Sequence, residues 1–119
     1  MPVRVLLVDD HPSFRATARL LLESEGFEVV GEAPDGASGL AAARELEPDL
    51  VLLDVQLPDI DGFEVAAQLT GGGGGPAVVI TSSRDAADFG PLVAASGARG
   101  FVPKAELSAA ALLSLMELV

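Results

Sequence analysis

Carboxylates follow two apolar runs of this sequence. Asp9 and Asp10 come directly after VRVLLV (3–8), and Asp54 closes the run LVLLD. Three carboxylates brought close together repel one another, and burial raises their pKa values. A hard divalent cation relieves this repulsion, because Mg²⁺ prefers oxygen ligands and binds through one or two carboxylates together with water and phosphate. These aspartates are therefore candidate magnesium ligands.

Hydroxyl and ammonium groups follow two further apolar runs. Thr81 and Ser82 end one of them, and Lys104 comes after the other. Asp54 is then a candidate nucleophile as well as a metal ligand, because aspartate forms acyl phosphates. Lys104 would balance charge on a phosphoryl oxygen, and the Thr81 hydroxyl would donate a hydrogen bond to another. This combination of side chains predicts phosphoryl chemistry.

These side chains must be positioned by the surrounding elements, and the sequence alternates apolar runs with segments of helical periodicity. The expected strands are 3–8, 27–33, 50–55, 77–81 and 99–102. The expected helices are 12–26, 35–48, 62–69, 88–96 and 107–119. Alternating units of this kind predict an α/β fold with a parallel sheet, helices on both faces and right-handed crossovers. Ligands bind beyond the carboxyl ends of such strands, so the polar residues should share one rim.

Composition bounds the size of the domain and the class of its partners. The 119 residues fit one domain, 1–119, whose core is aliphatic because the chain has five Phe and no Trp or Tyr. Seven Lys and Arg against 18 Asp and Glu give a net charge of −11, which argues against direct nucleic-acid binding. Cysteine is absent, so disulfides and thiolate metal sites are excluded. No secretory signal or membrane span is recognisable, and we expect a cytoplasmic location.

Each candidate residue also has a simpler structural explanation. Asp9 and Asp10 precede a helix and could act as its N-cap, favoured by the helix dipole. Asp54 could cap a turn, Lys104 could be a solvated surface lysine, and Thr81 suits a strand because it is β-branched. The shared position of these residues at four strand ends favours a common site over separate explanations.

A run of five glycines, 71–75, precedes the fourth expected strand. A phosphate-binding loop is excluded here, because the run lacks the GK[ST] ending and no helix follows it. We therefore expect a flexible surface connection.

Beyond these single residues, the chain contains the segments VLLVDDHPSFR, LVLLDVQLPDIDG and GARGFVPK. Together they resemble the receiver domain of two-component response regulators, a CheY-like family, and the likeness extends over essentially the whole chain. VDDHPSFR is most similar to receivers attached to a LuxR/NarL-type helix-turn-helix output. The resemblance implies a single-domain (βα)5 flavodoxin-like fold with strand order 2-1-3-4-5. It also implies that a sensor histidine kinase phosphorylates Asp54.

The resemblance assigns further roles around the phosphoacceptor. Mg²⁺ would be bound by Asp9, Asp10, Asp54 and the backbone carbonyl of Gln56. Gln56 lies two positions beyond the phosphoacceptor Asp54, and Ser83 lies two positions beyond the switch hydroxyl of Thr81. Such positions in the family influence the access of water to the phosphoryl group, so we predict that these two residues set its lifetime.

The switch itself would involve residues of the last two strands. The resemblance implies that Thr81 turns toward the phosphoryl group, Phe101 rotates inward and Lys104 bridges to the acyl phosphate. The face formed by the fourth helix, fifth strand and fifth helix would then change shape. Counting back from Lys104 at the usual family interval reaches Ser82, whereas counting forward from the start of the fourth strand reaches Thr81, and we favour Thr81. Ala105 follows the lysine where many receivers have proline.

His11 is the only histidine and follows the acidic pair directly. No nucleotide-binding motif surrounds it, which argues against a self-phosphorylating kinase residue. We expect a residue at the start of the first helix that tunes the neighbouring site.

The predicted function is a phosphorylation-controlled switch that catalyses only its own phosphorylation and dephosphorylation, not a metabolic enzyme. Expected partners are a sensor histidine kinase and, after phosphorylation, a second copy of the chain. Neither nucleic acid nor membrane is expected to bind directly. The chain is either a stand-alone receiver or part of a longer regulator whose output domain binds DNA.

Two alternatives compete with this prediction. The first is a pseudo-receiver, a protein-binding module that never takes phosphate, against which the complete set of polar residues argues. The second is a phosphatase or phosphotransferase with Asp54 as its nucleophile. It is disfavoured because the haloacid-dehalogenase pattern needs an aspartate where this chain has Gln56.

Overall fold

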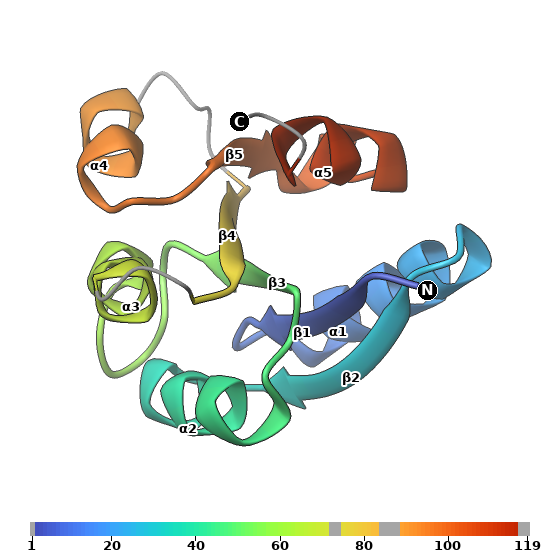
Figure 1. Ribbon diagram of the computed structural model, residues 1–119, viewed down its shortest axis with the longest axis horizontal. Helices are drawn as coiled ribbons and strands as arrows, with labels where there is room; N and C mark the ends of the chain where they lie inside the picture. The colour runs from blue at the N-terminus through green and yellow to red at the C-terminus, as the bar shows by residue number, and fades with distance from the viewer. Residues whose placement is uncertain (1, 72–74, 84–88, 117–119) are drawn as a thin grey trace.

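The computed structural model describes residues 2–71, 75–83 and 89–116, and it confirms the predicted five-stranded parallel sheet in the order β2-β1-β3-β4-β5. The strands are β1 (Arg4–Val8), β2 (Glu28–Ala33), β3 (Leu50–Asp54), β4 (Ala77–Ser82) and β5 (Gly100–Pro103). The helices are α1 (Pro12–Ser24), α2 (Gly36–Leu46), α3 (Gly62–Thr70), α4 (Gly90–Ala95) and α5 (Ala109–Met116). Figure 1 shows these helices on both sides of the sheet, which confirms the predicted α/β layers.

The observed ends of the elements agree closely with the predicted ones. Among the described residues the structure adds a short 3₁₀ helix, η2 (Lys104–Glu106), directly after β5. Glycines 72–74 of the predicted flexible connection lie outside the described residues, as do residue 88 of the predicted fourth helix and residues 117–119 of the fifth. No cis peptide bond occurs within the described parts of the chain.

The sheet separates two hydrophobic cores, because alternate residues of a strand point to opposite faces. Val5 and Leu7 of β1 pack with α1 and α5, whereas Leu6 and Val8 pack with α2 and α3. β3 is buried along its whole length, as expected of a central parallel strand. Because Asp54 is the last residue of β3, its carboxylate stands at the end of a fully packed strand.

Two aspartates fix the loop that leads from Asp54 to α3. Asp59 accepts hydrogen bonds from the backbone N–H groups of Gly36 and Ala37, at 2.8 and 2.9 Å, and so caps the start of α2. These bonds lower the pKa of the Asp59 carboxyl group. Asp61 is the N-cap of α3 and accepts a hydrogen bond from the third residue of that helix. The loop is therefore tied to two helices at once.

Gly62, the first residue of α3, approaches the end of β3. Its backbone N–H donates to the carbonyl oxygen of Val55 at 2.8 Å. A Cβ atom at this position would collide with the backbone carbonyl of Asp54 and with the Cα atom of Val55. Only glycine allows this close approach, which sets the path of the chain immediately behind the Asp54 carboxylate.

Candidate functional site

Four side chains converge at the carboxyl ends of β1 and β3. One ligand atom from each of Asp9, Asp10, His11 and Asp54 lies within 4.8 Å of all the others. Asp9 and Asp54 are buried, with 2% and 3% of their surface exposed, whereas Asp10 and His11 lie on the surface. The structure therefore brings together the three aspartates selected from the sequence and adds the histidine between them.

Lys104, which directly follows the edge strand β5 at the same end of the sheet, completes this cluster. Its Nζ atom lies 2.7 Å from Oδ2 of Asp9 and 3.4 Å from Oδ2 of Asp54. The ammonium group also lies over the ring of Phe14, 4.4 Å from its centroid, which is a cation–π contact. The Lys104 side chain is only 15% exposed, so the explanation as a solvated surface lysine is wrong.

Burial and mutual repulsion disfavour the ionised carboxylates, and a further cation would stabilise them. Burial is the main cause that raises the pKa of Asp54, and repulsion from Asp9 adds to it, while Lys104 opposes both. The buried Oδ2 atom of Asp9 contacts the Lys104 ammonium group at 2.7 Å, and the same ammonium group also faces Asp54. One lysine beside three clustered carboxylates leaves negative charge uncompensated, and these oxygen atoms fit a hard divalent cation such as Mg²⁺.

The N-cap explanation for the acidic pair is also wrong. The N-cap of α1 is His11, and its side chain makes no capping hydrogen bond. Oδ1 of Asp9 accepts a hydrogen bond of 2.8 Å from the backbone N–H of His11, outside the helix. Neither aspartate is therefore used to begin α1, and both remain available to the site.

Thr81 and Ser82 differ in the side of the sheet that they face. Thr81 is the register partner of Asp54, and alternation along β4 places it on the same face as Val79. Ser82 falls on the opposite face. The Thr81 hydroxyl is buried and donates a hydrogen bond of 2.7 Å to the carbonyl oxygen of Val102 in β5. Thr81 thus shares a face with Asp54 but bonds the neighbouring strand.

The other predicted residues lie around the rim. Phe101 is partly buried against the core under α2 and α3, and its ring centroid lies 5.9 Å from that of Phe89. Gln56 is exposed, and its backbone N–H lies 3.4 Å from Oδ1 of Asp54. Ser83 is exposed at the end of β4. The roles assigned to these three residues from the resemblance stay predictions.

Arg15 is a residue of the site that sequence reasoning missed. Its Nη1 atom donates a hydrogen bond to the backbone carbonyl of Asp9, and its Nε donates to Glu32 at 3.0 Å. Arg19 also donates to Glu32, at 2.8 Å, and the two arginines, Arg19 foremost, lower the pKa of the Glu32 carboxyl group. The one signal in the sequence is that Arg15 lies one helical turn after His11.

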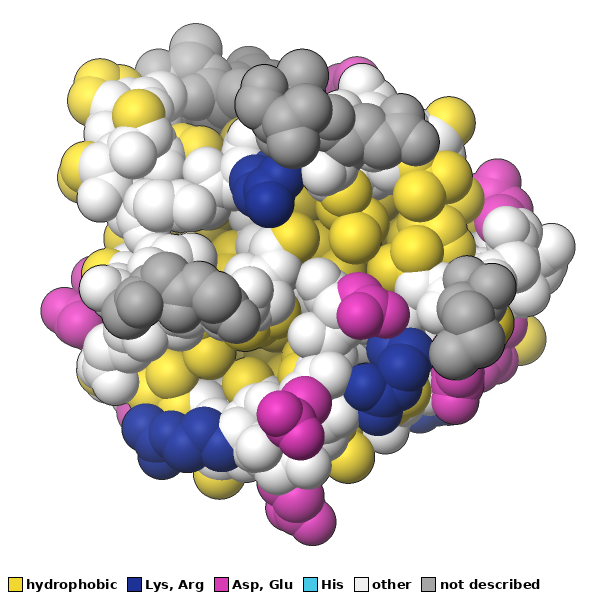
Figure 2. All heavy atoms as spheres, in the orientation of Figure 1, with side chains coloured by type: hydrophobic (Ala, Val, Ile, Leu, Met, Phe, Trp, Pro, Cys, Tyr) yellow, Lys and Arg dark blue, Asp and Glu magenta, His cyan; other side chains and the backbone are white. Residues whose placement is uncertain are grey.

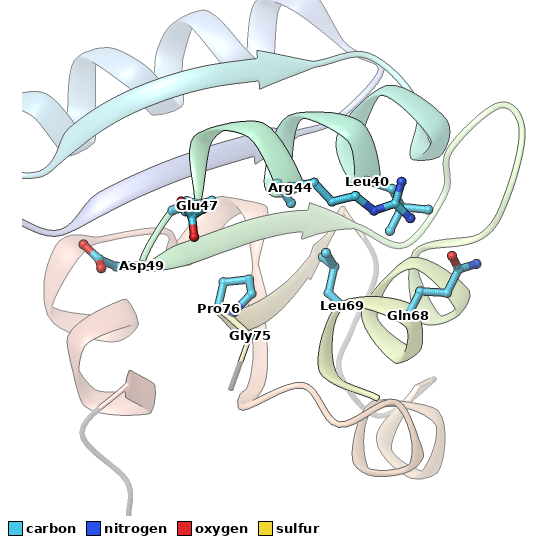
Figure 3. Close-up of a pocket in the computed structure, with 10 residues that line it drawn as sticks. Leu40, Arg44, Glu47, Asp49, Gln68, Leu69, Gly75 and Pro76 are labelled. Atoms are coloured by element: carbon cyan, nitrogen blue, oxygen red, sulfur yellow. The ribbon is translucent and has the colours of Figure 1, made fainter. Parts of the chain in front are cut away.

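A cavity of about 630 Å³ lies at the opposite end of the sheet, and Figure 3 shows its lining. Arg44 of α2 and Gln68 of α3 border it, together with Asp49 and Pro76, which precede β3 and β4. It therefore opens at the amino ends of the strands, whereas the carboxylates stand at their carboxyl ends. This cavity is separate from the candidate site.

Comparison with known proteins identifies the family. The model of the response regulator receiver domain matches residues 5–117. The chain belongs to the response regulator receiver family. It is 46% identical over 103 residues to a transcriptional regulator of Pseudomonas aeruginosa, an alignment that covers 87% of this chain and 50% of the relative. The chain therefore spans about half the length of this curated relative.

Solved structures of receivers agree with the fold. A two-component response regulator of the LuxR family from Aurantimonas sp. SI85-9A1 superposes with a TM-score of 0.88 and 31% identity, over 98% of this chain and 86% of that chain. The signal receiver domain of NarL from Mycobacterium tuberculosis gives 0.85 and 36% identity, over 98% of both chains. The structural neighbours are thus CheY-like receivers of LuxR/NarL-type regulators. No helix within the described residues is both long and apolar enough to cross a bilayer.

Proposed function

We propose that this receiver takes a phosphoryl group onto Asp54 from a sensor histidine kinase, with Mg²⁺ bound by Asp9, Asp10, Asp54 and the backbone carbonyl of Gln56. The observation that carries the proposal is the placement of two buried carboxylates and Lys104 in direct contact at one rim of the sheet. A structural ion pair would need only one of these carboxylates. Three acids around one lysine leave negative charge for a cation to balance.

The reaction is a displacement at phosphorus. An Asp54 carboxylate oxygen forms the new O–P bond, and the P–N bond of the donor phosphohistidine breaks, with the electron pair leaving on the imidazole nitrogen. With acetyl phosphate as the donor, a P–O bond breaks instead and acetate leaves. Bound Mg²⁺ would supply positive charge to the phosphoryl oxygens. Lys104, which lies 3.4 Å from the Asp54 carboxylate, is placed to neutralise the charge added to that residue.

Thr81 gives the site a means to report its state. In the unphosphorylated protein its hydroxyl bonds the Val102 carbonyl, at 2.7 Å. A phosphoryl group on the neighbouring Asp54 offers a charged acceptor, and a hydrogen bond to a charged group is stronger than one to a carbonyl. If Thr81 turns, the packing beside it changes, and Phe101 follows on the face formed by α4, β5 and α5. Phosphorylation can shift the equilibrium between the two packings only because the phosphoryl group makes different contacts in each of them.

The partners proposed for this face are a second copy of the chain and, in a longer regulator, a DNA-binding output domain. We do not expect the receiver itself to contact nucleic acid. Figure 2 shows, on one face, Lys and Arg side chains that lie apart from one another among acidic and hydrophobic ones. With a net charge of −11, such a surface does not favour phosphate backbones. The cytoplasmic location stays a prediction.

The deciding experiment is intact-protein mass after incubation with acetyl phosphate and Mg²⁺. We expect one phosphoryl adduct that requires the metal and is lost in Asp54→Asn. A matched control is Asp49→Asn, because Asp49 lies at the other end of β3. If the wild type gains no adduct and binds no beryllofluoride, the proposal fails, and the phosphate-independent pseudo-receiver takes its place.

A further inference from the structure

His11 lies against every carboxylate of the candidate site. Its Nδ1 atom is 3.1 Å from Oδ1 of Asp9, 3.2 Å from Oδ1 of Asp10 and 3.9 Å from Oδ2 of Asp54. The ring is otherwise open to solvent, with 62% of the side chain exposed. Nothing in the proposed phosphorylation requires a nitrogen atom at this position.

The spacing of these atoms matches the coordination shell of a small divalent ion. With metal–ligand bonds of about 2.1 Å, adjacent ligands lie about 3.0 Å apart in an octahedral shell and about 3.4 Å apart in a tetrahedral one. The Nδ1 distances to Asp9 and Asp10 fall in this range, and the distance to Asp54 is only slightly longer. Four ligand atoms within 4.8 Å of one another can therefore surround one ion.

The two oxygen atoms of Asp9 have different neighbours. Oδ2 faces Lys104 at 2.7 Å, while Oδ1 faces the imidazole of His11. The lysine thus does not occupy the position between Asp9, Asp10 and His11. Oδ1 of Asp9 also accepts a hydrogen bond of 2.8 Å from the backbone N–H of His11, which holds this carboxylate close to the imidazole. In the tautomer that carries its proton on Nε2, the lone pair of Nδ1 would complete a mixed set of nitrogen and oxygen ligands.

We propose that Nδ1 of His11 is a fourth ligand of this cation site, which consequently prefers divalent ions that bind imidazole, such as Ni²⁺ and Zn²⁺, to Mg²⁺. The inference rests on the proposed function only in taking the same carboxylates as the cation site. Imidazole suits these ions, whereas Mg²⁺ is held by oxygen ligands. Mg²⁺ would use the three carboxylates and leave His11 aside.

The test compares Ni²⁺ with Mg²⁺ by calorimetric titration of the wild-type chain and His11→Asn at one fixed pH. The asparagine amide can still donate a hydrogen bond to Asp9 or Asp10, but it is a poor ligand for Ni²⁺. We expect at least a tenfold loss of Ni²⁺ affinity and less than a twofold change for Mg²⁺. Equal losses for the two ions, or no loss of Ni²⁺ affinity, would overturn the inference.

Two further measurements separate this inference from simpler outcomes. In Asp54→Asn, Ni²⁺ affinity must also fall, because retention of full affinity would mean that the exposed histidine binds the ion by itself. Since His11 is the only histidine, Zn²⁺ must shift its Nδ1 resonance in the NMR spectrum, and Mg²⁺ must leave that resonance in place. If acetyl phosphate gives no adduct but the loss of Ni²⁺ affinity in His11→Asn is observed, the phosphorylation proposal alone is refuted. If the adduct forms but His11→Asn keeps its Ni²⁺ affinity, this inference alone is refuted.

Discussion

Replacing Asp54 by asparagine should stabilise the fold in the absence of metal. Asp54 is 3% exposed, and burial together with repulsion from Asp9 raises its pKa. Ionised Asp54 is therefore a cost to the folded state at neutral pH, which an uncharged amide of nearly the same shape removes. The site would thus be kept for chemistry at the expense of stability.

The magnitude follows from the distances in the site. With an effective dielectric constant of about 20, attraction between Lys104 and Asp54 at 3.4 Å is worth about 5 kcal/mol. Repulsion between Asp9 and Asp54, within 4.8 Å, amounts to about 3.5 kcal/mol or more. These contributions nearly cancel, so the desolvation of the Asp54 carboxylate, on the order of several kcal/mol, decides the sign. We expect a net gain of about 1–3 kcal/mol, since the buried amide also loses contact with water.

The pH dependence of this gain has a definite sign. The native pKa of Asp54 lies above its ordinary value of 3.8, so the folded state binds the extra proton in the window between the two pKa values. Wild-type stability falls as pH rises through this window, because the native state there binds more protons than the unfolded state. The advantage of Asp54→Asn is therefore complete above the native pKa and disappears below the ordinary value.

Urea unfolding of both proteins across this pH range, with a chelator present, provides the measurement. Glu45→Gln is the matched control, because it removes an exposed carboxylate of α2 and changes the net charge equally. At neutral pH we expect Asp54→Asn to raise the free energy of unfolding by about 1–3 kcal/mol, which in a separate thermal unfolding experiment corresponds to roughly 4 °C in melting temperature for each kcal/mol. The reasoning is refuted if the variant is less stable than the wild type, or if its advantage persists at low pH.

Three further predictions concern neighbouring residues. Lys104→Met leaves two buried carboxylates without a counter-charge, so it should lower the free energy of unfolding in urea at neutral pH by about 3–5 kcal/mol. Added Mg²⁺ should restore part of this loss, and an equal loss with and without Mg²⁺ would contradict the prediction. In Gly62→Ala the new Cβ atom collides with the Asp54 carbonyl, so the free energy of unfolding in urea should fall by about 1–3 kcal/mol. Adduct formation should also be slower than in the control Gly90→Ala, where the new Cβ atom meets open space. Thr81→Val removes the hydroxyl bonded to Val102 and should lower the free energy of unfolding by about 1 kcal/mol. Mass spectrometry should still find the phosphoryl adduct, but the NMR shifts of Phe101 on phosphorylation should disappear. Unchanged shifts would exclude Thr81 as the switch.

The sequence was sufficient for the sheet and for the position of the main acids. Periodicity and apolar runs give the elements, and the rule that ligands bind at the carboxyl ends of parallel strands brings Asp9, Asp10, Asp54 and Lys104 together. That rule fixes which end of the sheet a residue occupies. It also brings Thr81 and Ser82 to this end of the sheet, but the choice between them needed the observed register, in which Thr81 is the partner of Asp54.

The contacts within the site could not be predicted in the same way. Whether the Thr81 hydroxyl bonds a phosphoryl group or the carbonyl of Val102 depends on a side-chain rotation that no pattern encodes. Asp59 and Arg15 escaped notice for a related reason, since their partners lie 23 residues away along the chain in one case and on a backbone carbonyl in the other. The position of His11 against three carboxylates likewise depends on the turn that precedes α1.

The shared attachment of Lys104 has a thermodynamic consequence for the order of events at the site. The ammonium group divides its charge between Asp9 and Asp54, so a group on Asp54 that draws it closer weakens its hold on Oδ2 of Asp9. That oxygen is then free for a cation, and a bound cation in turn frees the lysine for Asp54. Each ligand should therefore raise the affinity for the other by the same factor. In such a receiver, metal binding and the proposed phosphorylation of Asp54 would each favour the other.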